Sequence, residues 1–178
     1  LELGLGENRF FISETNDEAM KVCVVGAGAR EHTLAHVLSR DTEVVVSPGN
    51  PGIPNSTVDN PEEISADLFV IGPEDPLVNG LADRLRKSGK KVFGPDSDGA
   101  RLEGSKAWMK QILNEAGVAT ARHGSFTDEK QALNFLDSMG DLFVIKTDGL
   151  AAGKGVLVTE DRAEATDAVK SYLAGDAF

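Results

Sequence analysis

The stretch Lys146-Thr-Asp-Gly-Leu-Ala-Ala-Gly-Lys-Gly-Val156 places three glycines and two lysines between two apolar runs. The run before it, Leu142–Ile145, predicts a buried strand, and the run after it, Val156–Val158, predicts a second one. A glycine-rich turn lets backbone N–H groups approach a ligand closely, and flanking lysines add positive charge. The stretch therefore predicts a hairpin whose loop binds the polyphosphate of a nucleotide. A hairpin loop with surface lysines is the alternative.

The loop does not have the Walker A pattern. Gly149 lies four positions before Gly153, where that pattern needs five, and a strand rather than a helix comes next. A strand–loop–strand hairpin acts as a lid, and we expect Asp148–Gly155 to close over the phosphates. Few apolar anchors predict a mobile loop, whereas Lys146, at the end of a strand, is expected to have a packed stem and an ammonium that faces the cleft.

Composition narrows the classes of function. The 178-residue chain has a net charge of −11, with 40% hydrophobic and 26% charged residues. These values indicate a globular protein and argue against a nucleic-acid surface, which needs a basic face. No apolar run approaches the roughly 20 residues of a membrane span. The single cysteine, Cys23, excludes an internal disulfide and indicates a reducing compartment. We expect a cytoplasmic protein that binds small molecules, not nucleic acid or a membrane.

The first 19 residues differ in pattern from the rest of the chain. They show no periodicity and lack the basic start and apolar centre of a signal peptide. Met20 then leads directly into an apolar run. We interpret residues 1–19 as an extension or an expression-derived segment that contributes little to the fold; a native extra strand or helix is the alternative.

Residues 20–100 alternate between strand and helix patterns. Such alternation, with continuously apolar strands, predicts an α/β domain with an open parallel sheet and helices packed on it. Among the helices, Pro76–Ser88 is expected to be capped by Asp75. The predicted strands are Val22–Gly26, Glu43–Ser47, Leu68–Gly72 and Lys91–Phe93, and the other predicted helix is Arg30–Arg40.

Residues 101–178 predict a separate α+β domain, which we expect to be incomplete. A strand is predicted near Arg122–Ser125, and Thr127 is expected to cap the helix after it. The predicted helices are Ser105–Ala116, Thr127 to about Met139, and Asp161 to Leu173, with two strands around the glycine loop.

Loops after the predicted strands of residues 20–100 predict a substrate site. Gly26–Glu31 opens a helix whose N–H groups suit a phosphate, but Glu31 takes the third glycine position of a dinucleotide fingerprint. Pro48–Gly52 and Gly72–Pro76 also leave the carboxyl ends of strands, where open sheets bind ligands. Simple tight turns are the alternative. The candidate residues are Gly26, Gly28, Arg30, Gly49, Asn50, Gly72, Pro73 and Glu74.

Taken in order, the motifs resemble those of the phosphoribosylamine–glycine ligase family of the ATP-grasp superfamily. Members usually have glycine at position 29 and alanine at position 147, where this chain has Ala29 and Thr147. The resemblance implies a Rossmann-like domain of the pre-ATP-grasp type followed by an incomplete ATP-grasp lid subdomain. It covers Met20 to the end and rests on Val24–His32, Pro48–Gly52, Gly72–Leu77, Phe93–Pro95, Glu103–Lys106 and Lys146–Gly155.

The resemblance also implies the chemistry, which is ATP-dependent joining of glycine to 5-phosphoribosylamine in purine synthesis. The family's magnesium ligands lie beyond the position of Phe178. We therefore expect ATP and Mg²⁺ as cofactors, no metal ligand or assigned catalytic residue in this chain, and no ligase activity from it alone. Another ATP-grasp ligase and a non-catalytic nucleotide-binding module are the alternatives. The implied ATP-binding residues are Lys106, Lys146, Asp148, Gly149, Gly153, Lys154 and Gly155.

Overall fold

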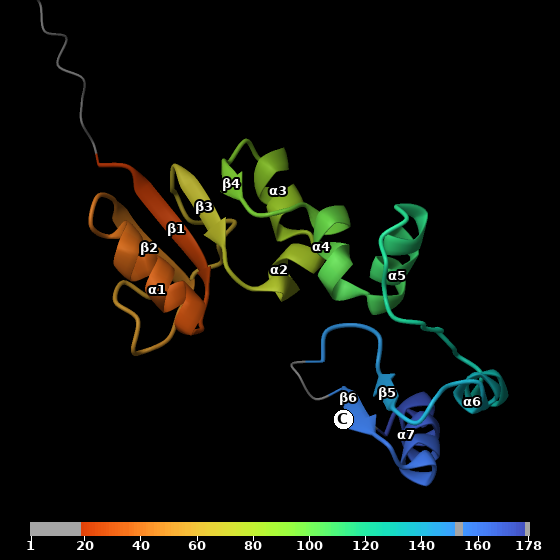
Figure 1. Cartoon of the computed structure of the whole chain (residues 1–178). Helices are drawn as coiled ribbons and strands as arrows, with labels where there is room; N and C mark the ends of the chain where they lie inside the picture. The colour runs from red at the N-terminus through yellow and green to blue at the C-terminus, as the bar shows by residue number, and fades with distance from the viewer. Residues whose placement is uncertain (1–18, 152–154, 177–178) are drawn as a thin grey trace, which may run out of the picture. The chain divides into compact units, whose positions relative to one another are not determined.

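The computed structural model describes residues 19–151 and 155–176 (Figure 1). The interpretation of residues 1–18, and the assignments of Gly153 and Lys154, lie outside the described residues. Contacts divide the chain into two compact units, Leu1–Leu68 and Phe69–Phe178.

The first unit is built on a strand–helix–strand motif. Strand β1 (Lys21–Gly26) and strand β2 (Glu43–Pro48) pair in parallel, from Lys21 opposite Glu43 to Gly26 opposite Pro48. Helix α1 (Ala29–Leu38) connects them and packs against both strands (Figure 1). The middle of β1 is buried throughout, because its apolar run is covered on both sides of the strand.

The sheet continues with β3 (Leu68–Ile71) and β4 (Val92–Phe93), which also pair in parallel. The strand order is β2-β1-β3-β4. The four strands predicted from apolar runs are thus confirmed, and so is the open parallel sheet. Strand β4 is only two residues long, and Phe93 is 71% exposed at its end.

The helix predicted over Pro76–Ser88 is wrong as a single element. The structure has two helices, α2 (Glu74–Val78) and α3 (Leu81–Lys87). Gly80 lies between them with a φ of +75°, a left-handed conformation that interrupts a helix. Asp75 lies inside α2 and does not cap it. The leucine spacing still identified the buried face, because Leu77, Leu81 and Leu85 are all buried.

A helix that the sequence did not predict, α4 (Ser97–Gly104), precedes α5 (Lys106–Glu115). Asp96 caps α4 by accepting a hydrogen bond from the Gly99 nitrogen at 2.8 Å. Two glycines lower the helix propensity of this segment, so the sequence does not indicate the helix. Close packing accounts for one of them, because a Cβ on Gly104 would lie 2.8 Å from Cγ2 of Val78. Helix α5 confirms the helix predicted there.

The strand predicted near Arg122–Ser125 is wrong, because this segment has no strand assignment. A side chain holds it instead: the guanidinium of Arg122 donates to the carbonyl oxygen of Ser138 at 2.6 Å and to its hydroxyl at 2.8 Å. Helix α6 (Glu129–Asp137) comes next, and its cap is Asp128 rather than Thr127, since Asp128 accepts from the Gln131 nitrogen.

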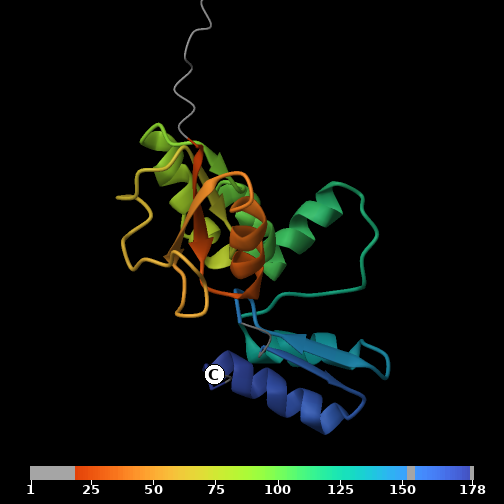
Figure 2. The same cartoon turned by 90° about the vertical axis from the view of Figure 1, so that its left-hand side faces the viewer.

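The glycine loop joins β5 (Phe143–Lys146) to β6 (Val156–Thr159), and the two strands pair antiparallel as predicted. Helix α7 (Arg162–Ala174) lies beside this hairpin (Figure 2). Its Ala165 and Val169 share a buried core with Phe143 of β5 and with α6. Among the described residues, no helix has the length and apolar character needed to cross a membrane.

Candidate nucleotide site

A groove of about 910 Å³ lies within the second unit. Helices α5, α6 and α7, strand β5 and the segment 121–127 contribute to its lining. Lys106, Lys146 and Asp148, three of the predicted ATP-binding residues, all line it. Two lysines that come from separate elements therefore line one groove, an arrangement that suits an anionic ligand.

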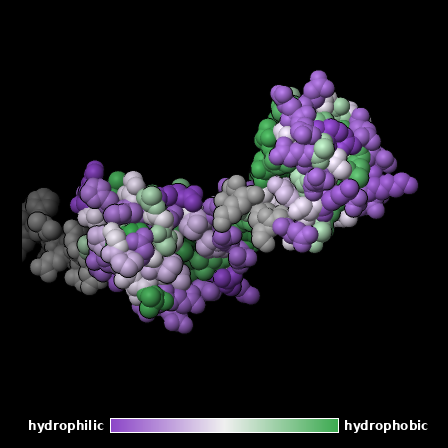
Figure 3. Space-filling model, turned by 90° about the horizontal axis from the view of Figure 1, so that it is seen from below, coloured by the Kyte–Doolittle hydropathy of each residue, from purple (hydrophilic) through white to green (hydrophobic). Residues whose placement is uncertain are grey.

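One face of the β5–β6 hairpin is apolar and open beside Lys146. In the register of the hairpin, Val144 lies opposite Val158 and Lys146 opposite Val156. The three valines are 43–59% exposed. Hydrophilic side chains cover most of the surface visible in Figure 3, and apolar ones form smaller patches. Lys146 is itself exposed, so the expected packing of its stem is wrong.

Asp148 binds the N-terminus of α5. Its Oδ1 accepts hydrogen bonds from the backbone nitrogens of Lys106 at 2.6 Å and Ala107 at 3.3 Å. Its Oδ2 accepts from the hydroxyl of Ser105 at 2.9 Å. Partial burial opposes ionisation, but the hydrogen bonds from Ser105 and from backbone N–H groups outweigh it and lower the pKa of Asp148.

The side chain of Lys106 also contacts the segment after β5. Its Nζ donates to the carbonyl oxygen of Gly149 at 2.7 Å. Gly149 has a φ of +85°, a left-handed conformation that few other residues adopt. The residues shortly after β5 thus bind both the backbone and the ammonium of Lys106.

Thr147 sits where the strands open into the loop. Its backbone nitrogen donates to the carbonyl oxygen of Gly155 at 2.9 Å, which joins the two ends of the loop. Its hydroxyl is buried and has no hydrogen-bond partner among the described residues. The sequence does not indicate this buried hydroxyl, except that Thr147 stands where the family that the chain resembles usually has alanine.

In the first unit, Glu31 occupies the helix N-terminus that was predicted to bind phosphate. Its Oε2 accepts from the Gly28 nitrogen at 2.7 Å, and its Oε1 lies 3.1 Å from Nε of Arg30. Glu31 is only 3% exposed. Sequence reasoning did not assign this role, although a glutamate at the third position of a helix is the local signal of a capping box.

Asn50 ties the first two loops together. Its Nδ2 donates to the carbonyl oxygen of Ala27 at 2.7 Å, and its Oδ1 accepts from the Gly52 nitrogen at 2.7 Å. Neighbouring Gly49 has a φ of +59°, and a Cβ there would lie 2.1 Å from Oγ of Ser56. The structure thus gives Gly49 and Asn50 a turn-forming role, whatever they bind.

The remaining predicted residues lie at strand ends. Gly26 ends β1 with a φ of +134°. In the second unit, Gly72 comes directly after β3, Pro73 is the extended N-cap of α2, and Glu74 is the first residue of that helix.

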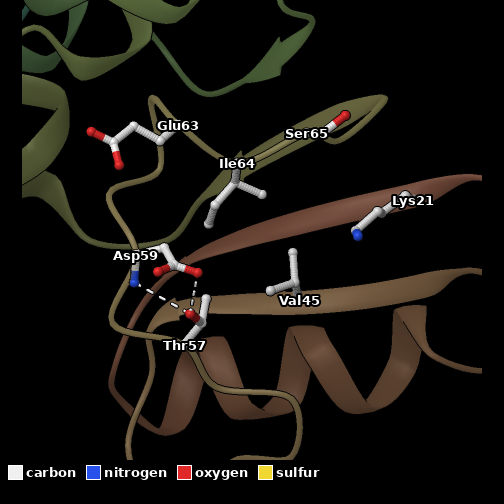
Figure 4. A pocket seen from close by; sticks show the side chains of 7 residues that line it. All are labelled: Lys21, Val45, Thr57, Asp59, Glu63, Ile64 and Ser65. Carbon is white, nitrogen blue, oxygen red and sulfur yellow. Dashed lines mark hydrogen bonds between the residues drawn. The ribbon is translucent and has the colours of Figure 1, made fainter.

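A smaller pocket of about 420 Å³ lies elsewhere in the first unit (Figure 4). Side chains of β1, β2 and the segment 57–65 line it, and none of the predicted site residues does. Two of its polar groups bind each other: the Thr57 hydroxyl donates to Oδ2 of Asp59 at 2.6 Å. Nothing about this pocket selects a ligand.

An open parallel sheet and an antiparallel hairpin with a glycine loop and a lysine-lined groove form the arrangement expected of an ATP-grasp protein. The chain belongs to the phosphoribosylglycinamide synthetase family: the model of the family's N domain matches residues 20–103, and that of its ATP-grasp (A) domain matches residues 104–178.

Curated relatives bear the name phosphoribosylamine–glycine ligase. The one from Synechocystis sp. is 48% identical over 168 residues, covering 84% of this chain and 40% of the relative. The one from Escherichia coli K12 is 42% identical over 177 residues, covering 89% of this chain and 41% of the relative. The chain thus spans about two fifths of the length of these relatives.

Solved structures agree with this fold. Phosphoribosylamine–glycine ligase from Thermotoga maritima has a TM-score of 0.74 at 29% identity, covering 88% of this chain and 40% of that one. N5-carboxyaminoimidazole synthetase from Staphylococcus aureus, solved with ADP, has a TM-score of 0.65 at 15% identity, covering 85% and 45%. At that identity the second likeness concerns the fold alone.

Proposed function

We propose that this chain binds ATP in the groove of the second unit and takes part in joining glycine to 5-phosphoribosylamine. The observation that carries the proposal is the presence of Lys106 and Lys146, from α5 and β5, on the lining of one groove. Membership of the phosphoribosylglycinamide synthetase family supports the choice of substrates.

In this proposal the two ammonium groups bind phosphate oxygens of ATP. The exposed valine face formed by Val144, Val156 and Val158 lies beside Lys146 and suits the flat, apolar faces of a purine. The glycines of the loop allow close backbone approach to phosphate. Gly149, Gly153, Lys154 and Gly155 complete the proposed ATP-binding set. The sequence also assigns Asp148 to this set, but its carboxylate is hydrogen-bonded to the start of α5, so its part in binding is indirect.

The chemistry of such a ligase needs an activated carboxylate. A glycine carboxylate oxygen attacks the γ-phosphorus of ATP, the bond to the β-phosphate oxygen breaks, and ADP leaves. The amine nitrogen of phosphoribosylamine then attacks the carbonyl carbon of the glycyl phosphate, inorganic phosphate leaves, and the nitrogen loses a proton. Lys106 and Lys146 would hold the phosphates in line and balance their charge during the first step.

The described residues do not fit a magnesium site. Among residues 19–151 and 155–176, no group of three or more His, Cys, Asp or Glu side chains is placed to hold a metal ion. ATP-grasp ligases generally use Mg²⁺ with ATP, but no step of the proposed reaction depends on a metal ligand from these residues.

The phosphoribosylamine site is proposed at the strand ends of the N-terminal domain. Residues Gly26, Gly28, Arg30, Gly49 and Asn50 lie at or after the ends of β1 and β2, and Gly72, Pro73 and Glu74 come after β3. Because Glu31 already accepts from the Gly28 nitrogen, a phosphate there would have to displace this carboxylate or use neighbouring N–H groups. We propose residues 20–100 as this domain and 101–178 as the ATP-grasp part; the junction of the two family matches at 103/104 supports that boundary.

Calorimetric titration with ATP tests the nucleotide site. Lys106→Ala and Lys146→Ala should each weaken ATP binding by about tenfold or more, the loss of one charge-assisted contact. Lys170→Ala is the matched control, since Lys170 is exposed on α7 and does not line the groove. Unchanged affinity in both groove variants would refute the proposed site.

A further inference from the structure

The contact between Asp148 and α5 has a role in the nucleotide site that the family assignment does not supply. We propose that Asp148 is a positioning residue: it fixes Lys106 in the groove and affects nucleotide binding through Lys106, without touching the nucleotide. This proposal rests on the proposed function, because it needs ATP to bind at Lys106.

The backbone amides at the start of α5 already have partners. Asp148 accepts from the nitrogens of Lys106 and Ala107. The hydroxyl of Ser105 accepts from the Trp108 nitrogen at 3.1 Å. The first three N–H groups of the helix are thus used, although such groups commonly bind anions. A phosphate near α5 would therefore contact side chains rather than these helix amides, and the ammonium of Lys106 is one such group on the groove lining.

Lys106 is held at both ends by two consecutive residues. Asp148 binds its backbone nitrogen, and the carbonyl oxygen of Gly149 binds its Nζ. Asp148 and Gly149 come two and three positions after Lys146 in the chain. One short segment therefore sets the positions of both lysines, which lowers the conformational entropy that a ligand must remove on binding.

The Asp148 carboxylate is directed at the helix. Its Oδ1 accepts hydrogen bonds from the backbone nitrogens of Lys106 and Ala107, and its Oδ2 accepts one from the hydroxyl of Ser105. Its negative charge lies at the positive end of the helix dipole, where it is stabilised. A free carboxylate in the groove would instead repel phosphate. This geometry gives Asp148 the part of a residue that positions Lys106, and not that of a group that binds the nucleotide directly.

A double-mutant cycle on ATP affinity distinguishes the two roles. In the 178-residue chain, Asp148→Ala should weaken ATP binding by about tenfold. In the Lys106→Ala background the same substitution should have almost no further effect. Asp148→Asn, which keeps an oxygen that can accept from the helix amides, should retain most of the affinity.

Asp161→Ala is a matched control for loss of a helix cap. Oδ1 of Asp161 accepts from the nitrogens of Ala163 at 2.7 Å and Glu164 at 3.3 Å at the start of α7, at nearly the same distances as Oδ1 of Asp148 at the start of α5. Asp161 does not line the groove. This variant should lose stability but keep its ATP affinity.

The outcomes separate the proposals. If wild type does not bind ATP, the proposed function fails and the positioning role falls with it. If wild type binds and the effects of Asp148→Ala and Lys106→Ala multiply, Asp148 acts independently of Lys106 and only the positioning role is overturned. Should Asp148→Ala not fold, Asp148→Asn decides, through its ATP affinity read together with the amide resonances of Lys106 and Ala107. Unchanged resonances in that variant with a full loss of affinity would overturn the role.

Discussion

The carboxylate of Asp148 lies 2.6 Å from the backbone nitrogen of Lys106, although the two residues are 42 positions apart in the chain. This hydrogen bond joins the glycine loop to helix α5. It is a tertiary helix cap, additional to the local one from Ser105. The loop and the helix are therefore not independent elements, and changes at Asp148 should appear at the start of α5.

The first prediction concerns pH. The pKa of Asp148 lies below its ordinary value of 3.8 because of the hydrogen bonds that it accepts. When folding lowers the pKa of a carboxyl group, the group contributes its full stabilisation of the fold at pH values above its ordinary pKa. The stabilisation is lost as the pH falls from 3.8 through the lowered pKa.

Thermal unfolding of wild type and Asp148→Asn, measured from about pH 5 down to about pH 2, checks this. Wild type should lose more stability than the variant over that window. The pKa of Asp83 is lowered as well, first of all by a hydrogen bond from the Ser97 nitrogen, but Asp83 is present in both proteins. Parallel curves for the two proteins would contradict the prediction.

The second prediction concerns the unpaired hydroxyl of Thr147, which has no hydrogen-bond partner among the described residues. A buried hydroxyl without a partner destabilises a fold by about 1–3 kcal/mol, and valine has nearly the same shape without the hydroxyl. Thr147→Val should therefore raise the free energy of unfolding by about 1 kcal/mol. Urea denaturation measures this. Thr166→Val is the contrasting variant, because the Thr166 hydroxyl donates to the carbonyl oxygen of Arg162 at 2.7 Å, and its loss should not stabilise the protein.

The third prediction concerns Glu31, which is buried on the N-terminus of α1. Glu31→Ala leaves the Gly28 nitrogen without this acceptor and should lower the free energy of unfolding by about 1–3 kcal/mol. Glu31→Gln keeps an oxygen in place and should lower it less. Chemical denaturation of both variants tests the order. Equal losses would show that the side-chain oxygen does not act as a cap.

Sequence patterns predicted the periodic parts of this fold and missed those that depend on tertiary contacts. The spacing of Leu77, Leu81 and Leu85 identified a buried face, but the left-handed Gly80 that divides the helix has no periodic signal. The strand expected at Arg122–Ser125 is wrong because strand propensity needs a pairing partner, and here the Arg122 guanidinium binds Ser138 instead.

The candidate site shows the same division. Lys106 and Lys146 were predicted from the motifs that carry them, and both line the groove. The contact of Asp148 with α5 could not be predicted, because capping signals are local and this one joins distant segments. For Glu31 the local signal is present, since it comes three positions after Gly28, but the same glycines also fit a phosphate-binding turn.

The fourth prediction concerns the turn at Gly149. Its φ is +85°, and a Cβ built there meets nothing within 4 Å. Gly149→Ala should therefore strain the backbone without causing a clash, at a cost of about 1–2 kcal/mol in the free energy of unfolding. Because the Gly149 carbonyl oxygen accepts from Nζ of Lys106, the strain should also disturb Lys106 and weaken ATP binding.

Gly140 is the control: it also has open space around its Cβ position but no positive φ. Gly140→Ala should leave stability unchanged or slightly raised, since alanine restricts the unfolded chain. Denaturant unfolding and ATP titration of both variants provide the measurements. Equal stabilities would show that the turn tolerates a side chain. Reduced stability with full ATP affinity would show that the turn does not position Lys106.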